Sequence, residues 1–268
     1  MTLAAVLAPR LPCWVVAWGL DVLYPRQEPE LARLHEICPP CGTALDIGAW
    51  YGPWSRRLAR RADRVVALEP VAEVCRALRE TVPGCVDVIN AAASDRSGDA
   101  AIWLADQDGR EARGLTSLEP RPSVHRRTRR VRLVTVDALG LSDIRFVKID
   151  VEGHEAAVLR GARKTLRRDR PNLFIETEAR LQPVERITGL LRGWGYRGWV
   201  LPGRDWVPLD GFDLSAHQRA CAHVVERGLL RRSLRPSPRY VNSVLFTPEE
   251  AAFPSAFPSG GLSGQSRA

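Results

Sequence analysis

The sequence predicts an α/β protein with a single open, mostly parallel sheet and helices on both faces. From Thr43 onward, short apolar runs alternate with longer segments of helical period, which is the pattern of repeated strand and helix units. The length of 268 residues suits one large core rather than two domains. Hydrophobic residues make up 45% of the chain and charged residues 26%, fractions typical of a globular protein.

In the first half of this pattern we expect strands at 44–48, 64–69 and 85–90. A helix from about Pro53 to Arg61 separates the first two, because proline is favoured at the first helical position. A second helix begins at Pro70, with apolar residues recurring on one face. Two further strands, AAIWLA and VRLVTVDAL, are expected on either side of a basic segment.

In the second half, RFVKIDV predicts a buried strand, followed by a helix from about 154 to 168 that Pro171 ends. A strand NLFIET, a helix at 184–193 and a final strand YVNSVLF complete the sheet. The predicted division is a helical cover at 1–42, a main domain at 43–250 and a disordered tail at 251–268 that is rich in Pro, Ser and Gly. Within the main domain we expect a substrate-side insertion at about 200–239, which holds a basic helix at about 216–232.

The apolar N-terminal stretch at 11–24 does not predict a membrane span, because Pro12 and Asp21 interrupt it and it is shorter than the ~20 residues required. It also lacks the basic start and the cleavage site of a signal peptide. We therefore expect a cytoplasmic protein in which one helical face, formed by Trp14, Trp18 and Val22, covers the main domain.

The net charge of +8 comes almost entirely from arginine, and the run RPSVHRRTRRVR at 121–132 is its densest part. A solvated loop between strands is the expected structure of this run. It could also hold a phosphorylated or nucleotide-linked acceptor, or follow a nucleic-acid backbone. A nucleic-acid partner is disfavoured, because no aromatic side chains interleave with these arginines.

Six scattered cysteines predict reduced thiols, and no metal-ligand spacing accompanies them. Nothing in the sequence specifies an oligomeric state.

The segment DIGAWYGPWS predicts a ligand-binding turn between the first strand and its helix. Gly48 and Gly52 allow a close approach of the backbone, and the free N–H groups at a helix start favour an anionic group. Glu69 ends the second strand 23 residues after Asp46, where a carboxylate can accept hydrogen bonds from both ribose hydroxyls. The turn lacks the three-glycine run that brings backbone to a pyrophosphate, so an adenosine-type cofactor is favoured over a dinucleotide.

The segment FVKIDVEGHE places Lys148, Asp150 and Glu152 on one face of a strand. Burying three ionisable groups is costly unless they pair with each other or with a ligand. The carboxyl end of a central strand is where such sheets bind ligands. A structural ion pair between Lys148 and Asp150 is the simpler explanation, and a site role is the favoured one.

Five segments together resemble the FkbM-type methyltransferase family: DIGAWYGPWS, the EP at 69–70, NAAASD at 90–95, VTVDAL at 134–139 and KIDVEGHEAAVLRGA at 148–162. The resemblance extends from about Thr43 to about Tyr196. It implies a class I, Rossmann-like methyltransferase fold with a seven-stranded, mostly parallel sheet, S-adenosylmethionine as donor, and a hydroxyl acceptor on a sugar or secondary metabolite.

The resemblance also assigns roles to individual residues. Asp46, Gly48 and Gly52 would hold the methionine end of the cofactor, Glu69 the ribose, and Asn90 with Ser94 the adenine side. The family often has asparagine where this chain has Trp50, so a polar contact at that position would be lost or replaced by packing.

A hydroxyl acceptor must lose its proton, and the candidate bases are Asp150, Glu152, His154 and Glu176. Of these, only His154 has an unperturbed pKa near neutrality. Asp150 and Glu176 are also the candidate ligands of a Mg²⁺ ion, a less favoured alternative, and no metal site is predicted outright. Other functions left open are a nucleic-acid methyltransferase, an adenosyl-cofactor-binding protein without activity, and an enzyme that uses a nicotinamide cofactor.

Overall fold

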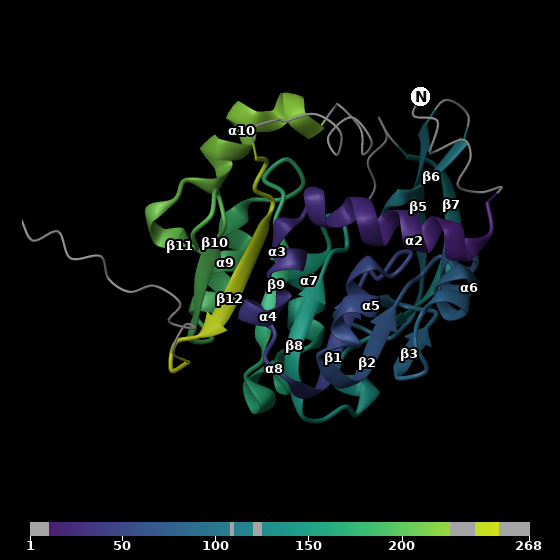
Figure 1. Cartoon of the computed structure of the whole chain (residues 1–268), viewed down its shortest axis with the longest axis horizontal. Helices are drawn as coiled ribbons and strands as arrows, with labels where there is room; N and C mark the ends of the chain where they lie inside the picture. Colours follow the sequence, from purple (N-terminus) through teal and green to yellow (C-terminus); the bar gives the residue numbers. More distant parts are fainter. Residues whose placement is uncertain (1–10, 108–109, 120–124, 226–238, 252–268) are drawn as a thin grey trace, which may run out of the picture.

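Two sheets organise the chain, and the larger one runs through its centre (Figure 1). The computed structural model describes residues 11–107, 110–119, 125–225 and 239–251. The larger sheet has eight strands in the order β11-β10-β12-β9-β8-β1-β2-β3. They are β1 (Cys41–Ile47), β2 (Ala62–Leu68), β3 (Val86–Ile89), β8 (Ile144–Ile149), β9 (Asn172–Glu176), β10 (Tyr196–Val200), β11 (Val207–Pro208) and β12 (Ser243–Pro248).

The strands from β3 to β9 are parallel neighbours, whereas the three pairings beyond β9 are antiparallel. The α/β class and the mostly parallel sheet are therefore confirmed. The count of seven is wrong, because the two-residue strand β11 extends the edge by pairing with Trp199 and Val200. Strand β10 follows a glycine-rich turn, and the sequence pattern did not predict it.

The parallel register places the expected site at one edge of the sheet. Asp46 of β1 lies opposite Ala67 of β2 on one side and Lys148 of β8 on the other. The loops after β1, β2, β8 and β9 consequently emerge side by side, as the carboxyl ends of neighbouring parallel strands must.

Helices cover both faces of this sheet, each over its own apolar core. One face carries α5 (Pro53–Leu58), α6 (Ala72–Thr81) and the short helices α3 (Pro29–Ala32) and α4 (Leu34–Ile37). The other carries α7 (Glu155–Gly161), α8 (Arg163–Asp169) and α9 (Val184–Arg192). On the first face Trp54 is 1% exposed and its ring lies 4.8 Å from that of Phe174 and 6.3 Å from that of Phe146, measured between centroids.

The predicted helix at 154–168 forms as two shorter helices that meet at Ala162. The insertion at 200–239 contains β11, the 3-10 turn η4 (Leu209–Gly211) and α10 (Leu214–Val225). The rest of its predicted basic helix lies outside the described residues, as does the tail predicted at 251–268 apart from residue 251. Within the described ranges, no helix combines the length and the apolar character needed to cross a membrane.

The second sheet has four strands in the order β4-β7-β5-β6. They are β4 (Ala92–Ala93), β5 (Gly98–Gln107), β6 (Arg110–Ser117) and β7 (His125–Val134). The basic run expected as a loop is therefore mostly strand β7, which pairs with β5 along its length. Its apolar members Val131 and Leu133 are buried against Val71 and Val74 of the main domain, and this alternation of charged and apolar residues is what makes it a strand. Residues 121–124 of the run lie outside the described part of the chain.

The N-terminal helix α2 (Cys13–Leu23) lies on α5 and α6, but in the opposite orientation from the one predicted. Trp14 is 70% exposed, Trp18 68% and Val22 46%, whereas Ala17 and Leu20 face the protein. The helix is apolar on nearly all sides, so periodicity could not choose the buried face. The expectation that the two tryptophans cover the main domain is wrong.

Replacing Trp54 by alanine should lower the free energy of unfolding by about 3–5 kcal/mol, since it opens a large cavity between α5 and the sheet. The matched control is Trp14→Ala, whose ring is exposed and whose loss should change the free energy of unfolding by less than about 0.5 kcal/mol. Denaturant titration followed by circular dichroism measures both. Equal effects of the two substitutions would contradict this packing.

Candidate functional site

The turn after β1 touches the turn after β8. Gly48 has a φ of 82°, and a Cβ at this position would lie 1.8 Å from the carbonyl oxygen of Asp150. The Asp150 N–H donates a hydrogen bond of 2.9 Å to the Ile47 carbonyl. Only glycine fits here, because a side chain would be strained in conformation and would overlap the neighbouring backbone. The first glycine of the predicted turn therefore allows the two strand ends to meet.

Asp46 lies at the carboxyl end of β1 and is fully buried. Its Oδ2 accepts a hydrogen bond of 2.5 Å from the Ser55 hydroxyl, whereas its Oδ1 is buried without a partner. Burial raises the pKa of this carboxyl, and the nearby Lys148 ammonium opposes that effect. A buried acceptor without a donor is costly, and no side chain of the described residues donates to this atom.

Glu69 follows β2 and bonds the turn after β1. Its two carboxyl oxygens accept the N–H groups of Trp50, at 3.0 Å, and of Val71, at 2.8 Å. Burial raises the pKa of Glu69 to about 7 in spite of these two bonds. The Asn90 carboxamide donates to the carbonyls of Glu69 and Pro70, so the loop after β3 holds the loop after β2.

Trp50, which stands where the resembling family often has asparagine, has a φ of 50°. Its ring packs against Tyr51, at 5.1 Å between centroids, and its indole nitrogen is buried without a hydrogen-bond partner. The turn therefore contains one buried donor and one buried acceptor, on Trp50 and Asp46, that no described residue satisfies. Gly52, with a φ of 76°, ends the turn and caps α5.

Lys148 and Asp150 form the ion pair that the sequence analysis gave as the simpler explanation of their spacing. The ammonium is 2.8 Å from Asp150 Oδ2 and 5.8 Å from the centroid of the Trp54 ring, and Lys148 as a residue is 4% exposed. Burial disfavours the charged form of Lys148. The negative charges of Asp150, Asp46 and Glu28 have the larger effect and raise the pKa of the lysine. The ammonium remains charged at neutral pH.

Glu176, the last residue of β9, is hydrogen-bonded to Asp150. Burial and the adjacent Asp150 charge raise the pKa of Glu176 well above its ordinary value. Burial opposes ionisation of Asp150 too, but Lys148 and the bond from Glu176 lower the pKa of Asp150. Glu176 is accordingly the protonated member of the pair and Asp150 the ionised one. Asn242, just before β12, donates to the other side of Glu176.

Glu152 completes a group of three carboxyls, since ligand atoms of Asp150, Glu152 and Glu176 lie within 4.8 Å of one another. Glu152 has a φ of 52°, and its carbonyl accepts a hydrogen bond of 2.7 Å from the Ser117 hydroxyl. The second sheet, through the end of β6, thereby fixes the loop that follows β8.

The N-terminal segment also reaches this edge. Glu28 accepts a hydrogen bond of 2.7 Å from the indole of Trp54, and burial raises the pKa of Glu28 to about 7. Tyr24 is bonded to Glu28, and burial raises its pKa, which the charges of Glu28 and Asp150 raise further. Its ring lies 6.3 Å from that of Trp50. The sequence did not predict these two residues as part of the site.

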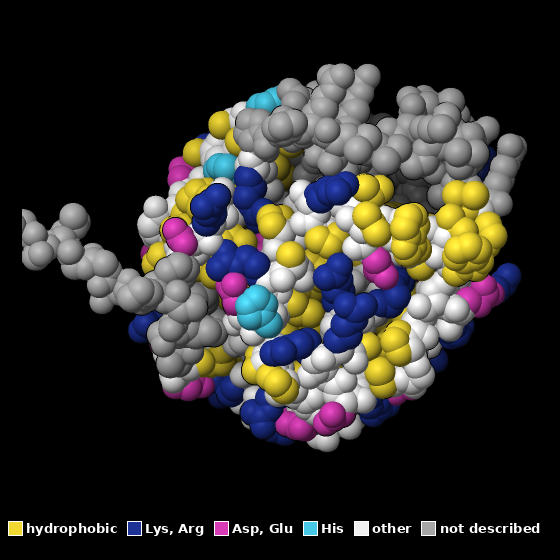
Figure 2. All heavy atoms as spheres, in the orientation of Figure 1, with side chains coloured by type: hydrophobic (Ala, Val, Ile, Leu, Met, Phe, Trp, Pro, Cys, Tyr) yellow, Lys and Arg dark blue, Asp and Glu magenta, His cyan; other side chains and the backbone are white. Residues whose placement is uncertain are grey.

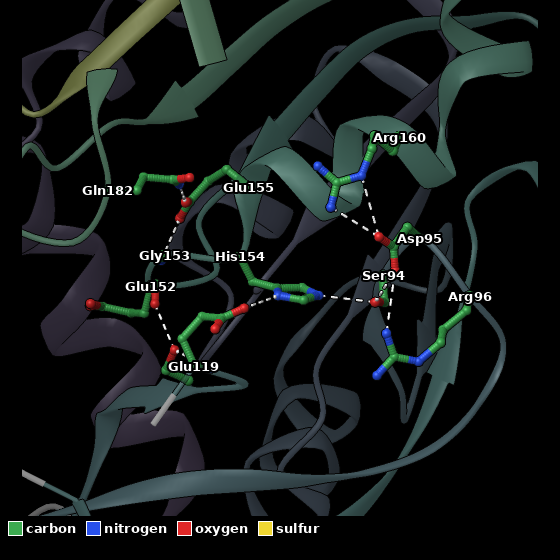
Figure 3. A network of polar contacts seen from close by, with 11 residues as sticks. Ser94, Asp95, Arg96, Glu119, Glu152, Gly153, His154, Glu155, Arg160 and Gln182 are labelled. Atoms are coloured by element: carbon green, nitrogen blue, oxygen red, sulfur yellow. Dashed lines mark hydrogen bonds and ion pairs between the residues drawn. The ribbon is translucent and has the colours of Figure 1, made fainter. Parts of the chain in front are cut away.

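His154 lies between two partners, as Figure 3 shows. Its Nε2 is 2.9 Å from the Ser94 hydroxyl and its Nδ1 is 3.0 Å from Glu119 Oε1. Both ring nitrogens are engaged, so neither is free for a substrate proton in this arrangement. Ser94, which was predicted on the adenine side, bonds the histidine in this structure. Its carbonyl oxygen packs closely against Gly161, where an added Cβ would lie only 1.9 Å from that oxygen.

The structure thus brings together Asp46, Gly48, Gly52, Glu69 and Asn90, which the sequence analysis predicted to bind the cofactor. Beside them lies a cluster of three carboxyls, those of Asp150, Glu152 and Glu176. Ser94 and His154 form a separate hydrogen-bonded unit with Glu119. The residues that the sequence analysis missed, Tyr24, Glu28, Glu119 and Asn242, come from distant segments and carry no local motif.

The methyltransferase FkbM domain model matches residues 43–197, which is more than half of the chain. No curated protein matches.

Among solved structures, methyltransferase FkbM from Methylobacillus flagellatus is 14% identical with a TM-score of 0.46, over 78% of this chain and 44% of that one. The chain therefore spans less than half of that structure's length. An O-methyltransferase from Bacillus cereus in complex with SAH is 16% identical with a TM-score of 0.44, over 76% of this chain and 91% of that one.

The raised pKa of Glu69 predicts a pH dependence of stability. Between its ordinary value of 4.5 and about 7, the folded protein binds a proton at this carboxyl that the unfolded chain releases. The free energy of unfolding should therefore fall as pH rises from 5 to 7, and Glu69→Gln should reduce that fall by up to roughly 3 kcal/mol. Asp63→Asn, at the exposed opposite end of β2, is the control and should keep the wild-type slope. Denaturant titrations at several pH values measure this, and an unchanged slope in Glu69→Gln would contradict the buried carboxyl.

Proposed function

Because this chain belongs to the FkbM methyltransferase family, we propose that it transfers a methyl group from S-adenosylmethionine to a hydroxyl of a small-molecule or glycan acceptor, such as a sugar or a secondary metabolite. The observation that carries the proposal is that two clusters of residues lie side by side at one sheet edge. One is a turn with unsatisfied buried polar atoms, and the other is a cluster of three carboxyls beside a buried lysine.

The first group fits an adenosyl cofactor in its chemistry. The unpartnered Asp46 Oδ1 suits the ammonium of the methionine end, and the Trp50 indole can donate to an acceptor atom. Each Glu69 oxygen accepts one backbone N–H and keeps a second lone pair for a ribose hydroxyl. Asn90 donates to the Glu69 carbonyl and so holds the loop that carries Glu69. In the proposed complex Asn90 borders the adenine side of the cofactor.

The second group fits the removal of a proton from the acceptor. Bound S-adenosylmethionine supplies an activated methyl group, so the residues around it need only orient the acceptor and take its proton. Asp150 is the ionised carboxylate in this group, and Lys148 and Glu176 both hold it in place. Although its pKa is low, Asp150 suffices as a base, because an oxygen that gains a methyl while it still carries its proton becomes a strong acid.

Proton transfer without a metal ion is the form that we propose. Lys148 already occupies one oxygen of Asp150, and Asn242 already donates to Glu176, so the carboxyls that would bind Mg²⁺ have other partners. Glu152 borders the acceptor side of this group. His154, with both nitrogens engaged, acts by fixing the start of α7 against Ser94 and Glu119.

A nucleic-acid acceptor is less well supported. In strand β7 Arg129 pairs with Glu73 at 2.5 Å and Arg130 with Asp99 at 2.9 Å, so part of the basic run is already neutralised within the fold.

The decisive experiment incubates the protein with labelled S-adenosylmethionine and fractionated metabolites, and identifies by mass the product that gains a methyl group. With that acceptor, Asp150→Asn should lower kcat by about 10²–10⁴-fold, since the proton acceptor is lost. Asp143→Asn, at the opposite end of β8, should keep the wild-type kcat. Full activity of Asp150→Asn would rule out the proposed base, and label transfer to RNA alone would rule out the proposed acceptor class.

A further inference from the structure

We propose that the exposed face of α2 docks the protein on the surface of a lipid bilayer that contains anionic headgroups. The inference is independent of the methyl transfer, because it rests on a surface outside the carboxyl ends of the strands.

The face is a continuous apolar stripe. Trp14, Trp18 and Val22 recur every fourth residue, so they share one side of the helix, and Leu11 lies just before it at 42% exposed. Single exposed apolar residues are common on proteins, but a row with two largely exposed tryptophans is not. Tryptophan is the residue that lies preferentially at the boundary between lipid headgroups and acyl chains.

The fold holds this stripe outward rather than leaving it loose. Ala17 and Leu20 are buried on the opposite side of the helix. Asp21, the only charged residue of α2, is bound by Arg56 through bonds of 2.9 and 3.0 Å, and Arg56 also donates to the Ala17 carbonyl. The one acidic charge of the helix is therefore neutralised, and the helix cannot turn its tryptophans inward without breaking these bonds.

Arginines lie directly beside the stripe. Arg57 of α5 donates to the Asp21 carbonyl at 3.1 Å, and the exposed Arg26 lies three residues after the end of α2. Figure 2 shows hydrophobic side chains gathered along α2 and Lys or Arg side chains next to them on the same face. Glu80, next to Cys13, is the acid at the start of the helix. An apolar helical face with flanking cations is the pattern of an interfacial helix, and anionic headgroups add to its affinity through the cations.

A second copy of the chain fits this surface less well. Two copies that met through α2 in a symmetric contact would place the same arginines against one another. Like charges brought together in this way oppose association, whereas an anionic bilayer attracts every one of them.

The test is co-sedimentation of the full chain with vesicles of phosphatidylcholine alone and of equimolar phosphatidylcholine and phosphatidylglycerol. We expect binding to the second kind only, weakened by added salt because the arginine contribution is screened. The double variant Trp14→Ala, Trp18→Ala should bind at least about tenfold more weakly, since it loses the apolar area that enters the bilayer. Both side chains are exposed, so a thermal melt should show that this variant stays folded.

Arg26→Gln should weaken binding, whereas Arg186→Gln, an exposed position on α9 at the opposite face of the sheet, should leave it unchanged. Two vesicle results would overturn the proposal: no binding to anionic vesicles at low salt, or binding that the double tryptophan variant retains in full. A third would be a dimer in light scattering that the double variant converts to a monomer, together with no binding of the wild-type protein to vesicles.

Discussion

The buried ammonium of Lys148 is the constraint on which the site depends. Burying a charge is costly unless opposite charges accompany it, and here Asp150 contacts it while Asp46 and Glu28 lie near enough to stabilise it. These carboxyls come from three different segments: β1, the loop after β8 and the N-terminal cover. The parallel register brings the strand ends together, and this one lysine joins carboxyls from two of them to the N-terminal segment. It also leaves Asp150 ionised beside a protonated Glu176.

The parts of this arrangement that the sequence predicted are the local ones. The alternation of apolar runs identified β1, β2, β8 and β9, and parallel strands necessarily end at one edge, so Asp46, Glu69 and Asp150 could be grouped before any coordinates were known. The pairing of Lys148 with Asp150 followed from their spacing on one strand face. Gly48 could be identified as a turn residue, but its contact with the Asp150 backbone depends on the register of β1 against β8.

The parts that the sequence could not predict depend on long-range packing. The arginine run was expected as a loop because its charges mask an alternating pattern, in which Val131 and Leu133 face the core of the second sheet. Helix α2 is apolar on almost every side, so only its contacts with α5 and α6 decide which residues are exposed. Ser94 and His154 were assigned to different roles, and only the fold shows that they bond each other and that Glu119 completes the unit.

The central claim is that the turn after β1 and Glu69 together hold an adenosyl cofactor beside Asp150. The most direct test is calorimetric titration of the protein with S-adenosylhomocysteine and, separately, with NAD. At a pH above 7, where Glu69 is ionised, the account predicts one site for S-adenosylhomocysteine and little affinity for NAD. It also predicts a loss of about tenfold or more in affinity on Glu69→Gln, since a charge-assisted bond to the ribose is removed. Tighter binding of NAD, or binding of S-adenosylhomocysteine that Glu69→Gln leaves unchanged, would contradict it.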